Sequence, residues 1–158
     1  MTNGLDEAMM RAALAQAEQA AERGEIPVGA VLTDGEGTVL AAAFNRREET
    51  NNPLSHAEAE VLRMAADKRE KRFFEDCTLY VTLEPCPMCA GAIVAARVGR
   101  VVYGAKDPRA GAFGSLLNLA DYPLEATPQI CGGVLEAECL APLRAFFAQK
   151  RIKKEKKN

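Results

Sequence analysis

Histidine is scarce in this 158-residue chain: His56 is the only one, and tryptophan is absent. A single histidine excludes a metal centre built from several histidines of one chain. It also excludes any mechanism that needs two imidazoles of one subunit. Whatever imidazole chemistry the protein performs must therefore use His56.

Long apolar runs are lacking as well. Stretches such as residues 90–96 fall well short of the roughly 20 residues that a membrane-spanning helix needs, and no signal peptide is recognisable. The five cysteines are an odd number and do not form the dense, even pattern of a disulfide-stapled secreted domain. These absences predict a cytoplasmic protein that does not enter a membrane.

Length and composition predict one domain. The chain is 48% hydrophobic and 27% charged, which is enough apolar material for a single core, and no repeat or linker divides it. We expect a domain over residues 1–149 and a basic tail over 150–158, which holds six of the 20 basic residues. Charge alone leaves two interpretations of the tail: a solvated, frayed end, or a segment that binds a polyanion such as nucleic acid.

The hydrophobic pattern alternates between strand and helix. Strands are predicted at residues 27–33, 38–43, 77–83, 100–104 and 128–131, and the first two form a hairpin. Helices are predicted at 5–23, 55–68, 86–97, 115–120 and 134–149, the last interrupted or kinked by Pro142. Polar or glycine-rich loops are expected at 45–54 and 105–114. The pattern predicts an α/β domain with a mixed sheet of about five strands.

Three side chains have the types and spacing of zinc ligands. Cys86 and Cys89 are three residues apart at a predicted helix start, where free backbone N–H groups favour thiolates. With His56 they make a set of three ligands, which leaves the fourth tetrahedral position of Zn²⁺ open for catalysis. A structural site would need a fourth ligand, and no second histidine exists.

Glu58 is the candidate proton shuttle, because it lies two residues from His56 and hydrolysis needs a group that moves protons beside a zinc-activated water. Each feature has a plainer interpretation when taken alone. Ser55 and Glu58 could form a helix capping box, Cys86 and Cys89 a redox pair, and His56 an ordinary first-turn residue. Together they match the H-x-E…P-C-x-x-C pattern, which is a known signature of zinc-dependent deaminases.

The remaining cysteines and a pair of aromatics are expected to be structural. Cys77, Cys131 and Cys139 lie in or beside apolar segments, which predicts small buried side chains. Phe146 and Phe147 could stack on bases, but two aromatics on a terminal helix are more often part of the core.

Four stretches carry a resemblance to one family, and they lie in residues 26–31, 82–92, 104–116 and 132–147. In these stretches the chain resembles the bacterial tRNA-specific adenosine deaminases, and the similarity runs in order from about residue 5 to 151. The zinc motif alone is shared by the wider cytidine deaminase-like superfamily. The stretch 104–116 and the double phenylalanine narrow the resemblance to the tRNA enzymes, whereas residues 125–130 differ from the Asn-His pair that many members carry.

The resemblance implies a three-layer α/β/α cytidine deaminase-like fold and a homodimer with one Zn²⁺ per subunit. The implied reaction is hydrolytic deamination of adenosine to inosine at the wobble position of a tRNA anticodon. His56, Cys86 and Cys89 match the zinc ligands and Glu58 the proton shuttle, and the basic tail would follow the tRNA phosphates. The implied substrate-binding residues are Asn45 for the nucleoside, Val28, Gly29, Ala30, Leu83, Glu84 and Pro85 for the base pocket, and Lys106, Asp107 and Arg109 for flanking nucleotides.

Other functions share the same zinc chemistry. A zinc deaminase of a free base or nucleoside, of the guanine or cytosine type, would use the same ligands. An inactive RNA-binding subunit would have no need of Glu58. A purely structural zinc module would unfold when its metal is chelated and would hydrolyse nothing.

Overall fold

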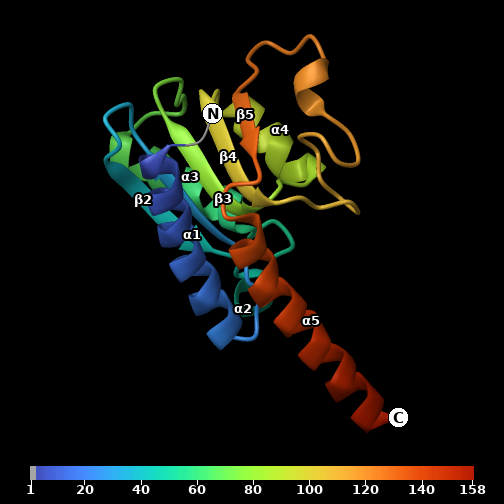
Figure 1. Cartoon of the computed structure of the whole chain (residues 1–158). Coiled ribbons are helices and arrows are strands. Elements are labelled where there is room, and N and C mark those ends of the chain that lie inside the picture. The colour runs from blue at the N-terminus through green and yellow to red at the C-terminus, as the bar shows by residue number, and fades with distance from the viewer. Residues whose placement is uncertain (1–2) are drawn as a thin grey trace.

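A mixed five-stranded sheet forms the centre of the protein, whose structure, a computed structural model, describes residues 3–158 (Figure 1). The strands are β1 Gly29–Thr33, β2 Val39–Phe44, β3 Thr78–Leu83, β4 Arg100–Ala105 and β5 Gln129–Gly132. Their order across the sheet is β2-β1-β3-β4-β5. Strand β1 runs antiparallel to β2 and β3, whereas β3, β4 and β5 are parallel to one another. The predicted hairpin, strand number and mixed pairing are confirmed.

Helices cover both faces of the sheet. They are α1 Gly4–Glu22, α2 Arg47–Thr50, α3 Ala57–Arg69, α4 Pro87–Ala95 and α5 Glu136–Lys157, with a single 3₁₀ turn at Leu119–Asp121. Figure 1 shows α1 and α5 side by side on one face, with α3 and α4 on the other. The prediction of three α/β/α layers is therefore confirmed.

Side chains that alternate along the strands separate the two halves of the core. Tyr80 and Val102 pack with α1 and α5, whereas the neighbouring Leu79 and Val101 pack with α3 and α4. This alternation follows from the two-residue period of a strand. Burial of each such side chain contributes about 1.5–3 kcal/mol to folding. The sheet thus fixes the relative position of the helices that carry the candidate site.

Three predicted segments differ from the structure. The loop predicted for residues 45–54 contains the short helix α2, and the helix predicted for 115–120 is only the turn Leu119–Asp121. Helix α5 continues through Pro142 to Lys157, so residues 150–157 are helical rather than frayed. Lysine and arginine are good helix formers, and basic side chains in a last helical turn complement the helix dipole. The end of α5 projects away from the sheet (Figure 1).

Among residues 3–158, no helix combines the length and the apolar character that crossing a membrane demands. The site is positioned instead by the end of the sheet. The carboxyl end of β3 leads through Glu84 and Pro85 directly into α4, and α3 lies beside α4 on the same face.

Candidate zinc site and substrate pocket

The three predicted metal ligands lie together at the starts of two helices. His56 is the residue that precedes α3, Cys86 precedes α4, and Cys89 lies in the first turn of α4. The Nδ1 atom of His56 is 3.7 Å from the Cys86 sulfur and 3.4 Å from the Cys89 sulfur. All three ligand atoms lie within 4.8 Å of one another. Within the described part of the chain, no other group of three such side chains meets this spacing.

The separations fit a tetrahedral zinc ion. Bonds of about 2.3 Å to sulfur and about 2.0–2.1 Å to nitrogen at a tetrahedral angle place the nitrogen and sulfur about 3.6 Å apart. The two observed distances, 3.7 and 3.4 Å, lie on either side of this value. Two sulfurs and one imidazole nitrogen therefore suit zinc and leave one position for water or substrate.

The pKa of each of these side chains depends on its hydrogen bonds to the others. A hydrogen bond from the Cys89 thiol, assisted by His56, lowers the pKa of Cys86 to about 4. The same contact with the Cys86 thiolate, together with burial, raises the pKa of Cys89. The hydrogen bond to Cys86 raises the pKa of the His56 imidazole above its usual value. A thiolate is thus available to bind a cation.

Glu58 is a buried carboxyl group beside this cluster. It lies in the first turn of α3, is 4% exposed and lines the pocket that contains His56 and Cys86. Burial raises the pKa of the Glu58 carboxyl, an effect that the positive charge of His56 partly offsets. A carboxyl group with a raised pKa is suited to gain and release a proton near neutral pH.

The capping-box interpretation of Glu58 is wrong. The Ser55 backbone N–H donates to the carbonyl of Asn52, and the Ser55 hydroxyl pairs with that of Thr50. Helix α3 begins after His56 rather than at Ser55, and His56 makes no side-chain cap. Glu58 therefore does not cap the Ser55 N–H, and its carboxyl group lines the pocket.

A pocket of about 170 Å³ opens beside the cluster. It is smaller than the roughly 300–1,000 Å³ of pockets for drug-sized ligands, which suits a single nucleobase. Its wall combines apolar side chains with a few polar ones. The lining residues are Ile26, Val28, Asn45, Arg47, His56, Ala57, Glu58, Leu83, Glu84, Cys86, Asp107 and Ala110.

Half of the predicted substrate-binding residues line this pocket: Val28, Asn45, Leu83, Glu84 and Asp107.

The other half lie outside the wall. Gly29 faces α1, where a Cβ would lie 2.0 Å from the Ala13 carbonyl oxygen, and Ala30 is fully buried in the core. Gly29 thus serves the close packing of helix on strand. Pro85 is buried, and Lys106 and Arg109 are exposed beside the opening rather than part of its wall.

Sequence reasoning missed four lining residues: Ile26, Arg47, Ala57 and Ala110. Each lies within three positions of a predicted site residue, so closeness along the chain to those residues could have identified them. Their contribution depends on how the loops fold, which the sequence pattern does not show.

One wall of the pocket is a loop held by Glu84. This side chain is 2% exposed, and its carboxylate accepts hydrogen bonds from the backbone N–H groups of Asp107, Phe113 and Ser115 and from the Ser115 hydroxyl. These contacts place Asp107 and Ala110 at the pocket. Glu84 therefore shapes the pocket through the loop as well as lining it.

A second, larger hollow of about 540 Å³ adjoins the first and shares Ile26, Asn45 and Arg47 with it. The last turns of α5 form its far side with Phe146, Lys150 and Lys153. We call it the α5 groove.

The structure corrects two expectations for the structural residues. Phe147 is 39% exposed and packs edge to face against Phe146, which is half-buried at the α5 groove, so the pair is not part of the core. Cys77 and Cys139 are buried as predicted, whereas Cys131 is only partly buried.

Comparisons with known proteins agree with this site. The family model described as the cytidine and deoxycytidylate deaminase zinc-binding region matches residues 4–105. The tRNA-specific adenosine deaminase of Bacillus subtilis (strain 168) is 45% identical over 151 residues, which cover 95% of this chain and 93% of that protein. The enzyme of the same name from Haemophilus influenzae is 43% identical over 95% of this chain and 87% of its own length.

Solved structures show the same similarity. One, from studies of A-to-I editing by tRNA:A34 deaminases at the wobble position of transfer RNA, is 42% identical with a TM-score of 0.83. The match covers 86% of this chain and 99% of that one. Guanine deaminase from Bacillus subtilis is 36% identical with a TM-score of 0.61, over 66% of each chain.

Proposed function

The chain belongs to the family of cytidine and deoxycytidylate deaminase zinc-binding domains, and we propose that it deaminates adenosine to inosine at the wobble position of tRNA anticodons. One observation carries the proposal: the buried carboxyl of Glu58 lines the same small pocket as two ligands of a three-ligand zinc site. The near-full-length similarity to tRNA-specific adenosine deaminases supports the choice of substrate.

The residues of the pocket divide the chemistry between them. His56, Cys86 and Cys89 would hold zinc, which lowers the pKa of a bound water from 15.7 to about 7 and so supplies a nucleophile at neutral pH. Glu58 would accept a proton from the attacking water and donate it to the ring nitrogen beside the carbon under attack. It would then take the proton of the hydroxyl added to that carbon and pass it to the amine, which leaves as ammonia as the carbonyl forms.

The walls of the pocket would hold the flipped base. Val28 and Leu83 offer apolar contact, and Asn45 would hydrogen-bond the nucleoside. Lys106, Asp107 and Arg109, on the loop that Glu84 holds, would touch the flanking nucleotides. Extrusion of the target nucleotide into a fitted pocket is how base-modifying enzymes reach their atoms.

The α5 groove provides a path for the RNA strand beside the pocket. Lys150 and Lys153 suit phosphates, and Phe146 offers an aromatic side chain for stacking. The exposed basic residues that follow, through Lys157, would add affinity that falls as salt rises, without base specificity. The interpretation of the tail as an RNA-binding segment thus gains a surface that leads to the pocket.

We also propose that the protein acts as a cytoplasmic homodimer with one zinc ion per subunit. Met64 of α3 and Met88 of α4 are 40% and 39% exposed. A second copy would cover such apolar side chains.

An assay on an anticodon stem-loop tests the proposed function. We expect conversion of adenosine to inosine at the wobble position, loss of the activity with a zinc chelator, and recovery when zinc is restored. Free guanine, cytosine and adenosine serve as competing substrates, because a guanine deaminase shares the fold. Activity on free guanine with none on the stem-loop would refute the tRNA assignment, and unfolding on chelation without any hydrolysis would indicate a structural zinc module.

A further inference from the structure

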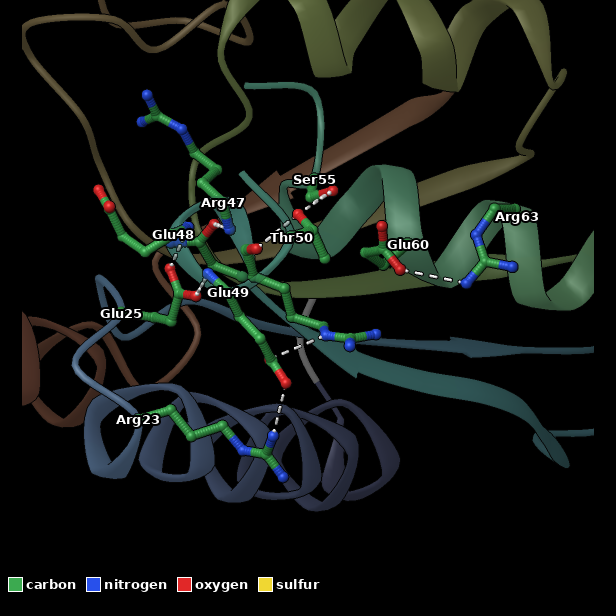
Figure 2. A network of polar contacts seen from close by, with 11 residues as sticks. Arg23, Glu25, Arg47, Glu48, Glu49, Thr50, Ser55, Glu60 and Arg63 are labelled. Atoms are coloured by element: carbon green, nitrogen blue, oxygen red, sulfur yellow. Dashed lines mark hydrogen bonds and ion pairs between the residues drawn. The ribbon is translucent and has the colours of Figure 1, made fainter. Parts of the chain in front are cut away.

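Glu25 is a buried carboxylate to which the proposed chemistry assigns no role. It is 1% exposed and lies in the turn between α1 and β1. Its Oε1 accepts a hydrogen bond of 2.9 Å from the backbone N–H of Glu48, and its Oε2 accepts one of 2.8 Å from that of Glu49 (Figure 2). Both carboxylate oxygens are thus committed to one backbone segment more than 20 residues away.

These two bonds replace the cap that α2 lacks. The residue before the helix, Arg46, makes no side-chain cap, and the amides that Glu25 binds are the second and third of α2. These are the amides that a helix-capping side chain normally satisfies. A helix of four residues is too short to be stable by itself. Helix α2 therefore depends on Glu25.

Helix α2 in turn fixes a wall of the substrate pocket. The Arg47 N–H donates to the side-chain oxygen of Asn45, and both residues line the pocket. At the same end of α2, the Arg46 N–H donates to the carbonyl of Ser55, the residue before His56. Residues 46–49 are thus held between Glu25 on one side and the loop that carries His56, the first zinc ligand, on the other.

The ion pairs of α2 are weaker than these hydrogen bonds. Glu49 pairs with Arg23 at 3.0 Å and with Arg46 at 3.1 Å, but all three side chains are one-third exposed or more. Exposed ion pairs contribute about 0–1 kcal/mol, whereas a buried carboxylate on backbone amides is shielded from water. Figure 2 shows the Glu25 carboxylate at one side of the network, and Glu49 with its side chain extended toward Arg23.

We propose that Glu25 is a positioning residue that holds Asn45 and Arg47 in the pocket wall by capping α2. It touches no reacting atom and acts through the loop; the proposal rests on the proposed deaminase function. A stem-loop substrate should therefore bind more weakly when Glu25 is replaced, while the zinc ligands keep their places.

The experiment compares E25Q and E25A with the wild type and with E22Q. Glu22 is an exposed residue three positions earlier, so E22Q removes the same charge without touching α2. Each protein is measured for zinc content, for amide hydrogen exchange, and for kcat and KM on the stem-loop. Glutamine keeps one acceptor oxygen and alanine keeps none.

We expect the amides of Glu48 and Glu49 to exchange about 2- to 30-fold faster in the Glu25 variants, with E25A above E25Q. Amides of α3 should stay protected and zinc content should stay at one per chain. Per zinc-loaded protein, kcat/KM should fall about tenfold in E25Q, mainly through KM, and further in E25A. E22Q should match the wild type in all measurements.

Two results would overturn the proposal: unchanged exchange of the α2 amides, or faster exchange with kcat and KM within twofold of the wild type, which would make Glu25 merely structural. If E25A does not fold, E25Q alone decides. A wild type that leaves the stem-loop unmodified refutes the proposed function instead, and the exchange measurement still tests the cap.

Discussion

The zinc half of the pocket and its outer walls are built in different ways. His56, Cys86 and Cys89 lie at the starts of α3 and α4, where regular helices and the core beneath them fix the side chains. The walls are irregular segments, and each is held by one buried carboxylate: Glu25 binds the amides of α2, and Glu84 binds those of the loop after β4.

The zinc ligands, which would carry the chemistry, are thus held independently of the walls, which would recognise the substrate. Ligands placed on helices that pack against the sheet keep their geometry when a neighbouring loop moves. Walls held by a few hydrogen bonds are easier to alter, so a substitution in a wall can change the substrate that fits without moving the zinc ligands. The guanine deaminase from Bacillus subtilis, which shares the fold at 36% identity, is consistent with such a division.

Glu58→Gln should have the largest effect, because it removes the group that transfers protons and leaves the folded structure unchanged. Glutamine has nearly the same shape and cannot carry the proton, so turnover on the stem-loop should fall about 10²- to 10⁴-fold. The substitution removes a carboxyl group whose pKa burial already raises, so the folded protein should keep its stability and its zinc. Single-turnover kinetics and metal analysis measure both.

Glu60→Gln is the matched control for this variant. Glu60 lies on the same helix two positions later, pairs with Arg63 at 3.2 Å and does not line the substrate pocket. Its replacement should leave turnover within about twofold of the wild type, since a helix pair with an exposed arginine contributes only about 0.3–0.5 kcal/mol. Turnover of E58Q near the wild-type value would remove Glu58 from the mechanism.

The sequence predicted the zinc half of the pocket better than it predicted the walls. His56, Glu58, Cys86 and Cys89 were predicted because their spacing is local and their residue types are dictated by zinc and proton transfer. Glu25 escaped because its partners, the amides of α2, are more than 20 residues away and carry no side-chain pattern. A buried glutamate in a turn has no sequence feature that distinguishes it from an exposed one.

The fold shows the same contrast between local and distant causes. Strands and long helices followed from hydrophobic periodicity, and the parallel pairing of β3 and β4 from the helix between them. The family resemblance assigned Gly29 to the pocket with Val28 and Ala30, but alternation along β1 turns it toward α1. The helical end of α5 was missed because its charge pattern also suits a solvated, irregular tail.

Gly111→Ala tests the wall that Glu84 holds and should have an intermediate effect. A Cβ at this position would lie 2.3 Å from the Glu84 carboxyl group and 2.6 Å from the Asp107 carbonyl oxygen. The loop must shift to admit it, and Asp107 and Ala110 shift with it. We expect kcat/KM on the stem-loop to fall about tenfold at constant zinc content, in line with the roughly 1–3 kcal/mol that overpacking costs.

Gly91→Ala provides the control, since Gly91 lies within α4 and a Cβ there meets nothing within 4 Å. Alanine in a helix interior is favoured over glycine by about 0.5–1 kcal/mol, so this variant should melt slightly higher with unchanged kinetics. Equal kcat/KM for both alanine variants would show that the loop adapts without consequence for the substrate.

Asp6→Asn should have the smallest effect on activity, because Asp6 belongs to neither half of the pocket. Its buried carboxylate receives two hydrogen bonds of 2.8 Å from Arg100 and one of 3.0 Å from the Tyr80 hydroxyl, which tie α1 to the sheet. The Arg100 hydrogen bond lowers the pKa of Asp6 below 3.8, and burial only partly opposes it. The ionised form is therefore the one that stabilises the fold.

The sign of the pH dependence follows from that lowered pKa. The stabilisation is fully present above the unfolded value of about 3.9 and is lost as the pH falls through the lower folded value. We expect Asp6→Asn to reduce the free energy of unfolding by about 1–3 kcal/mol at pH 7, and the gap from the wild type to close toward pH 3. Urea unfolding at several pH values measures the gap. A gap that stays constant from pH 7 to pH 3 would mean that packing, not charge, holds α1. At pH 7, kcat and KM of the zinc-loaded variant should match those of the wild type.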